Sequence, residues 1–212
     1  MSAAPAPHVA TRVTIIPTGG ANIASLEFAL QRLNVACTVS DDEAQIRAAS
    51  HVILPGVGAA GDAMQRLRAN GLAQVIPTLT QPVLGICLGM QLMFDSSDED
   101  QTRCLGLIPG NAARFDPAAS RPVPHMGWNT VQAQGNSPLL ADIEPAEPYA
   151  YFVHSYAIGL SAFTTARTQY GIHFSASVQR NNFHGVQFHP ERSAKVGAKV
   201  LQNFLAQRSP CA

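Results

Sequence analysis

The chain has 212 residues, and its 14 basic residues balance its 14 acidic residues, so the formal net charge is zero. It has no basic stripe that would indicate a nucleic-acid partner, and no apolar run approaches the roughly 20 residues that a membrane-spanning helix needs. Four scattered cysteines and the absence of a secretory signal in residues 1–10, which we expect to form a disordered tail, indicate a reducing cytoplasm. The seven histidines show no metal-ligand spacing, so we expect no metal and no cofactor.

The first half of the chain alternates short apolar strands with amphipathic helices. The apolar runs predict strands over 13–16, 36–39, 51–54 and 82–87. Helical spacing predicts a helix over 22–33, which Asn22 can cap, and further helices over 43–49, 59–69 and 72–79. Such alternation is typical of a parallel sheet with helices on both faces.

The second half has a different pattern, in which strands follow one another through short turns. We expect strands over 130–133, 149–158, 164–169, 174–179 and 183–188, with a hairpin connection at 180–182. A proline-rich loop over 115–124 and a last helix over 194–207 complete the prediction. The sequence therefore predicts a single α/β domain over residues 11–208, with a flavodoxin-like, open, mostly parallel sheet and an added antiparallel portion.

One cysteine lies in a glycine frame, Gly85-Ile86-Cys87-Leu88-Gly89, directly after an apolar run. A buried strand that runs into such a frame and then into a helical pattern is the layout of a nucleophile elbow. The flanking residues must be small because the turn is sharp and the helix packs closely on the strand. The partial positive charge at a helix start favours the thiolate, which is the reactive form. A lone cysteine beside glycines is otherwise an ordinary core residue.

A histidine and a glutamate far downstream supply what a cysteine nucleophile lacks. His189 precedes Pro190, which favours an extended conformation, so that His189 and Glu191 face the same side of the chain. Glu191 can then hold one ring nitrogen while the other faces Cys87. The three residues predict a catalytic triad of nucleophile, base and orienting acid.

Several segments together carry a resemblance to a known family. The elbow, continued by Met90 and Gln91, and the His189-Pro190-Glu191 motif resemble the class I (triad) glutamine amidotransferases. The segments 55–58, 124–129, 151–156 and 182–193 resemble those of the glutaminase subunits of imidazole glycerol phosphate synthase, and the match runs from about residue 13 to 205. The chain departs from the family pattern at Pro17, after the first strand.

The resemblance implies hydrolysis of the glutamine side-chain amide through a thioester on Cys87, with His189 transferring protons and Glu191 orienting it. The backbone amides of Val57 and Leu88 are the expected oxyanion donors, and the glycines on both sides of Val57 make its peptide easy to reorient. The substrate-binding residues implied are Gly58, Gln91, His154, Ser155 and Tyr156.

A separate synthase must use the ammonia, because ammonia loses its nucleophilicity when water protonates it. The resemblance implies a (β/α)8-barrel cyclase that makes imidazole glycerol phosphate and an aminoimidazole carboxamide ribotide in histidine biosynthesis. The positions that match the family's interface are Asn22, Met126, Trp128 and Arg192.

Other interpretations remain open. The chain can be a glutaminase that serves another ammonia-using synthase, a catalytically silent regulatory subunit, or a cysteine peptidase or γ-glutamyl hydrolase on the same fold. Among the single residues, Gln91 is compatible with a solvated helix position and Trp128 with a core position. His125 and His154 are compatible with structural roles.

Overall fold

The computed structural model describes residues 11–19, 23–118, 121–135, 137–143 and 148–208. The predicted tail over 1–10 and the predicted helix cap Asn22 lie outside the described residues. None of the helices in the described ranges is long and apolar enough to cross a membrane.

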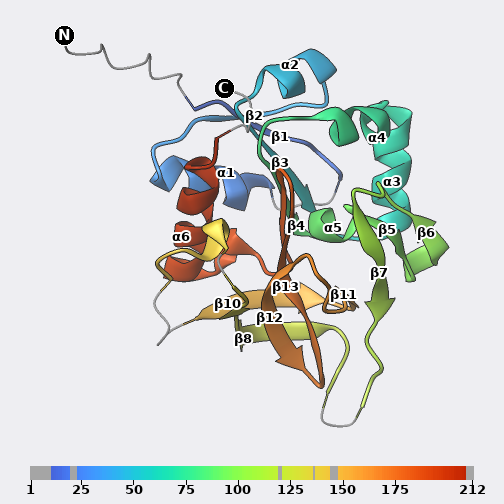
Figure 1. The fold of residues 1–212 in the computed structure, drawn as a ribbon. Coiled ribbons are helices and arrows are strands. Elements are labelled where there is room, and N and C mark those ends of the chain that lie inside the picture. The colour runs from blue at the N-terminus through green and yellow to red at the C-terminus, as the bar shows by residue number, and fades with distance from the viewer. Residues whose placement is uncertain (1–10, 20–22, 119–120, 136, 144–147, 209–212) are drawn as a thin grey trace.

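An eight-stranded sheet forms the centre of the molecule (Figure 1), in the order β2-β1-β3-β4-β14-β13-β12-β9. The first five strands in this order pair in parallel, and the last three pairings are antiparallel. The parallel strands are β2 (Cys37–Val39), β1 (Val13–Ile15), β3 (His51–Gly56), β4 (Val83–Cys87) and β14 (Phe183–Val186). The predicted mostly parallel sheet with an antiparallel addition is therefore confirmed.

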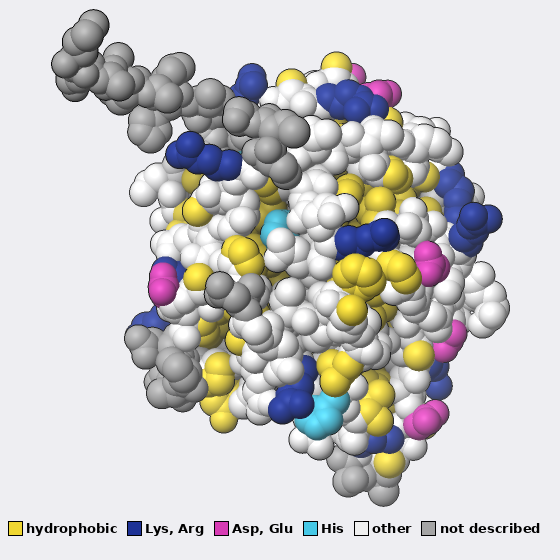
Figure 2. All heavy atoms as spheres, in the orientation of Figure 1, with side chains coloured by type: hydrophobic (Ala, Val, Ile, Leu, Met, Phe, Trp, Pro, Cys, Tyr) yellow, Lys and Arg dark blue, Asp and Glu magenta, His cyan; other side chains and the backbone are white. Residues whose placement is uncertain are grey.

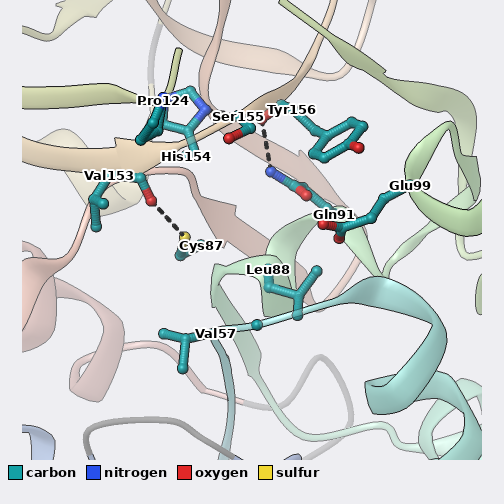
Figure 3. A pocket seen from close by; sticks show the side chains of 11 residues that line it. Val57, Cys87, Leu88, Gln91, Glu99, Pro124, Val153, His154, Ser155 and Tyr156 are labelled. Carbon is teal, nitrogen blue, oxygen red and sulfur yellow. Dashed lines mark hydrogen bonds between the residues drawn. The ribbon is translucent and has the colours of Figure 1, made fainter.

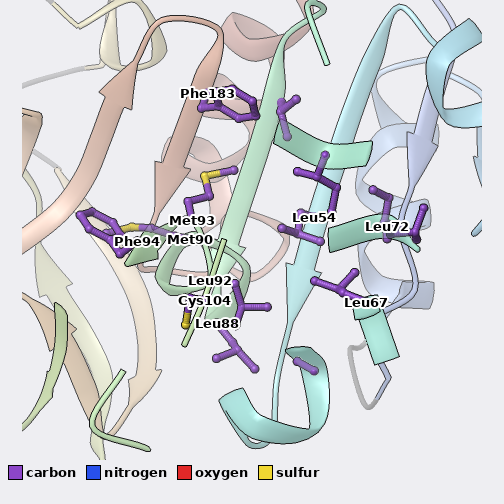
Figure 4. Close-up of a cluster of buried hydrophobic side chains, with 14 of the residues drawn as sticks. Leu54, Leu67, Leu72, Leu88, Met90, Leu92, Met93, Phe94, Cys104 and Phe183 are labelled. Atoms are coloured by element: carbon purple, nitrogen blue, oxygen red, sulfur yellow. The ribbon is translucent and has the colours of Figure 1, made fainter. Parts of the chain in front are cut away.

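Helices cover both faces of the parallel part, as predicted. On one face, α3 (Ala60–Ala69), α4 (Leu72–Val75) and the short α5 (Leu88–Gln91) pack into one hydrophobic cluster, which Figure 4 shows around β4. On the other face, α1 (Ile23–Arg32) and α6 (Ala194–Leu205) pack into a second cluster. The short helix α2 (Glu43–Ala48) is capped by Asp42, whose side chain accepts a hydrogen bond from the Gln45 backbone at 2.8 Å. The helix predicted over 72–79 ends early, and the 3₁₀ turn Ile76–Thr78 follows α4.

The antiparallel part consists of β13 (Ile172–Arg180), β12 (Thr164–Tyr170) and the edge strand β9 (Gln132–Ala133). Residues 180–182 connect β13 to β14 as a hairpin, as expected, with Asn181 at a positive φ of 55°. Through this hairpin, β13 leads into β14, which pairs with β4 and precedes His189 in the sequence.

The structure also has two small sheets, β10-β8 and β11-β7-β5-β6, whose strands were predicted only in part. The predicted strand over 149–158 is two strands, β10 (Tyr149–His154) and β11 (Tyr156–Ile158), which pair with different partners. The predicted strand over 130–133 begins earlier, because β8 (His125–Thr130) pairs along all of β10 before β9 begins. The strands β5 (Phe94–Ser97), β6 (Thr102–Arg103) and β7 (Ile108–Arg114) were missed; they form one sheet with β11.

Charged side chains of both signs are interspersed over the face shown in Figure 2, with small groups of hydrophobic side chains between them.

Candidate active site

The glycine frame around Cys87 is required by close packing of α5 on the sheet. A Cβ atom on Gly85 would lie 2.7 Å from the Gly89 carbonyl oxygen, and one on Gly89 would overlap the Leu54 carbonyl oxygen. Cys87 ends β4 with φ 54° and ψ −112°, a conformation that side-chain-bearing residues rarely adopt. The predicted nucleophile elbow is therefore present in the backbone, although the helix that follows is only one turn long.

The sulfur of Cys87 lies at the edge of a cavity of about 290 Å³. Figure 3 shows Cys87 at one end of this pocket and Gln91 with Glu99 toward the other. The Cys87 Sγ lies 3.8 Å from the Val153 carbonyl oxygen, to which a thiol can donate. A cavity of this volume suits a small molecule the size of an amino acid.

His189 and Glu191 form a buried pair on the other side of the elbow. The Nδ1 atom of His189 lies 2.8 Å from Oε1 of Glu191, and their side chains are only 7% and 6% exposed. His189 is extended, and Glu191 follows in the 3₁₀ turn Pro190–Arg192. Because a carboxylate only accepts hydrogen bonds, Nδ1 carries the proton.

The second ring nitrogen of His189, Nε2, is buried and has no hydrogen-bond partner within the described segments. Burial lowers the pKa of His189, but the negative charges of the neighbouring Cys87 thiolate and of the hydrogen-bonded Glu191 carboxylate outweigh this effect and raise the pKa to about 10. The three residues predicted as a triad are thus brought together, with His189 as an imidazolium at neutral pH. This charge state suits a group that must donate a proton to a leaving amine.

The residues predicted to donate to an oxyanion, Val57 and Leu88, both line the cavity beside Cys87. Gly58 has a positive φ of 89°, and apart from its chain neighbours no other atom lies within 4 Å of the position that a Cβ atom would take there. Gly56 differs, because it pairs with Cys87 in the sheet and a Cβ atom on it would lie 2.8 Å from the Gly89 nitrogen. The conformational freedom expected on both sides of Val57 is therefore found only at Gly58.

The predicted substrate-binding residues Gly58, Gln91, His154, Ser155 and Tyr156 all line the same cavity. Gln91 is not a solvated helix residue, because it is buried and its Nε2 donates to the Tyr156 carbonyl at 2.8 Å. His154 is buried and its Nδ1 lies 2.8 Å from the same carbonyl. Burial chiefly lowers the pKa of His154, to about 3, so the ring is neutral and orders this segment.

The neighbouring His125 has a structural role as well. Its Nδ1 lies 3.1 Å from Nε2 of His154, and its ring stacks on Tyr170 with 4.1 Å between the ring centroids. Burial lowers the pKa of His125 to about 4. The two rings form a neutral, buried pair behind the pocket.

Glu99 is a pocket residue that sequence reasoning missed. It lines the cavity, and its Oε2 accepts a hydrogen bond from the Ala60 backbone at 2.8 Å. Burial raises its pKa. It lies on a short 3₁₀ turn (Glu99–Gln101) within an acidic stretch, so the sequence around it gave no signal that distinguished it from a solvated loop residue.

Those predicted partner-contact residues that the structure describes lie on one face of the molecule. Met126 and Trp128 on β8 are 67% and 54% exposed, so Trp128 is not a core residue. The Arg192 guanidinium lies 4.4 Å from the centre of the Tyr151 ring, beside Trp128. Asn22 lies outside the described residues. Within the described segments, no group of three or more potential metal-ligating side chains is placed to bind a metal ion.

Comparison with known proteins identifies the family. Residues 16–208 match the family model of class-I glutamine amidotransferases. The chain is 49% identical to imidazole glycerol phosphate synthase subunit HisH 2 of Legionella pneumophila (strain Philadelphia 1), with 94% of this chain and all of that protein covered. It is 48% identical, with the same coverage, to the subunit HisH of Xanthomonas axonopodis pv. citri.

Solved structures of low sequence identity share the fold. A putative GMP synthase subunit from Thermoplasma acidophilum superposes with a TM-score of 0.72 at 18% identity, with 94% of each chain covered. The structure of PurLQS from Thermotoga maritima gives a TM-score of 0.70 at 19% identity, with 93% of this chain and 98% of that chain covered. On its sequence and its fold, the chain belongs to the class-I glutamine amidotransferases.

Proposed function

We propose that this chain hydrolyses the side-chain amide of glutamine to glutamate and ammonia, as the glutaminase subunit of an imidazole glycerol phosphate synthase. The observation that carries the proposal is the buried His189–Glu191 pair beside Cys87, at a cavity sized for an amino acid. The names of the relatives support the placement in histidine biosynthesis. Residues 11–208 act as one amidotransferase domain, and the protein works in the cytoplasm.

The reaction begins when the Cys87 thiolate attacks the carboxamide carbon. A C–S bond forms, and the carbonyl π-electrons move to the oxygen, which the backbone N–H groups of Val57 and Leu88 stabilise. The imidazolium of His189 donates its Nε2 proton to the leaving nitrogen, the C–N bond breaks, and ammonia departs. Glu191 keeps Nδ1 protonated and the ring in place throughout.

The thioester is then hydrolysed with the same residues, and His189 now acts as a base instead of an acid. Neutral His189 takes a proton from water through Nε2, and the hydroxide equivalent adds to the thioester carbon. Collapse of this intermediate breaks the C–S bond and restores the Cys87 thiolate, and His189 remains an imidazolium. The product leaves as the γ-carboxylic acid, which loses its proton to solvent to give glutamate.

The far end of the cavity binds the amino-acid end of glutamine. Glu99 supplies a carboxylate for the α-ammonium group, and a charge-assisted hydrogen bond of this kind is among the stronger ones available. Both N–H groups of Gln91 are used by protein acceptors, so its carbonyl oxygen is the atom that it offers to the substrate. Gly58 and the backbone of 154–156 complete the binding surface.

Ammonia is passed to a (β/α)8-barrel cyclase that docks on the face carrying Met126, Trp128 and Arg192. The exposed Met126 and Trp128 side chains supply the apolar anchors that interfaces favour. This face is the exposed side of the β8–β10 pair, and Val153 of β10 lines the cavity, so docking and catalysis share one strand.

The test is covalent labelling by an electrophilic glutamine analogue, followed by mass mapping. The proposal expects one adduct, on Cys87, that excess glutamine prevents, while a Cys37→Ser control remains fully labelled. An adduct that forms equally in Cys87→Ala, or that glutamine does not prevent, would contradict the assignment.

A further inference from the structure

Gln187 is a fully buried polar residue that contacts the nucleophile. It follows β14, whose Val186 pairs with Ile86 of β4, so that Gln187 lies beside Cys87 on the neighbouring strand. Its Nε2 lies 3.7 Å from the Cys87 sulfur, and its side chain has no solvent exposure. Its backbone N–H donates to the Ala176 carbonyl at 2.9 Å, which fixes the position of the residue from the other side.

The hydrogen-bond network sets the direction of the Gln187 amide. Nε2 of Gln91 lies 2.9 Å from Oε1 of Gln187 and 2.8 Å from the Tyr156 carbonyl oxygen. Both acceptors are oxygens, so turning the Gln91 amide over would place three oxygens together. Gln187 must therefore present its oxygen to Gln91 and its N–H to the sulfur.

Two polar neighbours of the sulfur, besides His189, favour opposite charge states. The Val153 carbonyl oxygen accepts a hydrogen bond from a thiol but repels a thiolate. The Gln187 N–H can donate to the sulfur in either state, and the bond is stronger to the negatively charged form. When Cys87 loses its proton, Gln187 thus adds a stabilising hydrogen bond to the charge of the neighbouring His189 imidazolium.

On the basis of the proposed function, we propose that Gln187 is a positioning residue of the glutaminase, which stabilises the Cys87 thiolate through Nε2 and orients Gln91 through Oε1. One buried amide thereby links the reacting sulfur to the residue that binds the substrate. Loss of the N–H should lower the reactivity of Cys87, and loss of the oxygen should weaken glutamine binding through Gln91.

Two substitutions separate these roles. Gln187→Met is similar in length and removes both polar atoms, whereas Gln187→Glu keeps an oxygen for Gln91 but cannot donate to the sulfur when ionised. Gln81→Met is the matched control, because Gln81 is also buried but donates to the Ile46 carbonyl, near the opposite end of β4. Any loss that reflects only the cost of replacing a buried glutamine should appear in this control too.

The first measurement is the rate at which iodoacetamide alkylates Cys87 at one fixed pH, followed by mass mapping of the Cys87 peptide. In this reaction the thiolate forms a C–S bond and iodide leaves, so the assay needs no glutamine. Both Gln187 variants should be alkylated about 10- to 100-fold more slowly than the wild type, the effect expected for one lost hydrogen bond to a charged group. Gln81→Met should react at the wild-type rate.

The second measurement is the split between kcat and KM for glutamine. Gln187→Glu should lower kcat with little change in KM, and Gln187→Met should lower kcat and raise KM. If Gln187→Met does not fold, Gln187→Asn, whose amide is too short to reach both partners, replaces it with the same expectation.

Wild-type alkylation rates in the folded variants, or an equal loss in Gln81→Met, would overturn the proposal. The failure of the proposed function would appear differently, as slow alkylation of the Gln187 variants in a protein whose wild type releases no ammonia from glutamine.

Discussion

The contact between Glu191 and His189 allows the sharpest single test of the triad, by the substitution Glu191→Gln. The amide oxygen can still accept the Nδ1 proton at the 2.8 Å position, so the ring keeps its orientation while the negative charge is lost. Both side chains are more than nine-tenths buried, so water screens this charge very little.

The size of the effect follows from the pKa of His189. Burial lowers this pKa, and the contacts with Cys87 and Glu191 outweigh burial and raise it from 6.5 to about 10. A hydrogen bond to a charged group is worth about 1.5–3 kcal/mol, which corresponds to a pKa change of roughly one to two. The variant should therefore lose its imidazolium at a lower pH, although the ring stays charged at neutral pH. Its kcat at neutral pH should still fall roughly 10- to 100-fold, less than in Cys87→Ala, because the imidazolium that re-forms when His189 takes a proton from water loses the same stabilisation.

The sign of the stability effect is fixed by linkage. Because folding raises the pKa of His189, its contribution to the free energy of unfolding is complete below pH 6.5 and is lost as the pH rises through about 10. The wild type should thus be more stable than Glu191→Gln at pH 6, and the difference should shrink toward pH 10.

Denaturant unfolding of both proteins between pH 6 and pH 10, with kcat for ammonia release at each pH, measures both effects. The difference between the two proteins cancels other groups that titrate in this range, among them Cys104, whose pKa burial raises to about 11. A difference in stability that does not change with pH would refute the charge argument. A loss of activity equal to that of Cys87→Ala, with the fold intact, would refute the orienting role of Glu191.

Four further substitutions test the other parts of the site. Cys87→Ala should abolish ammonia release from glutamine without unfolding the chain, and supplied ammonia should still support the cyclase; residual activity near wild type would exclude Cys87 as the nucleophile. His189→Ala should lower kcat by about 10²–10⁴-fold, since one group serves both proton transfers; a shift in KM alone would contradict this. Glu99→Gln should raise the KM for glutamine roughly 10- to 100-fold with a small change in kcat. The control Asp98→Asn, at an exposed neighbouring residue, should leave this KM unchanged. A KM for Glu99→Gln equal to that of the wild type would exclude Glu99 from the binding site. Trp128→Ala should weaken cyclase binding by about 2 kcal/mol or more, as at an interface hot spot. The control Leu160→Ala, at an exposed apolar residue outside β8 and β10, should not weaken it. If calorimetric titration finds the same affinity for both variants, the interface lies elsewhere.

The parallel half of the fold could be predicted because its signals are local. Each strand from β1 to β4 is a short apolar run bounded by a helix with regular apolar spacing, and such alternation specifies a parallel sheet without knowledge of distant contacts. The elbow was equally predictable, since Gly85 and Gly89 are needed wherever a helix packs this closely on a strand.

The small sheets could not be predicted in the same way because their strands depend on distant partners. The strands β5, β6 and β7 carry polar residues such as Asp95 and Asn111, whose side chains are used in contacts with other parts of the same sheet. The break at Ser155, which separates β10 from β11, follows from pairing with two different strands. No local pattern marks either feature.

Within the candidate site, the sequence motifs identified the proposed catalytic residues but not the polar residues that surround them. Cys87, His189 and Glu191 were found from their motifs. Glu99 was missed because a carboxylate in an acidic loop is usually solvated, and its place in the pocket depends on a contact with the Ala60 backbone. Gln187 was missed as a contact of the sulfur because only the pairing of β14 with β4 brings it to Cys87.

The most direct test of the central claim is ammonia release from glutamine while the purified cyclase is titrated, with and without the cyclase substrate. The chain alone should be slow, because unused ammonia wastes glutamine and the backbone of residues 56–58 can hold the Val57 N–H in a non-productive orientation. Docking of the substrate-bound cyclase should raise turnover by about 10²–10³-fold, the value of one oxyanion donor, and Cys87→Ala should stay inactive throughout. A rate that is high without the cyclase and flat across the titration would contradict the account and indicate an independent glutaminase.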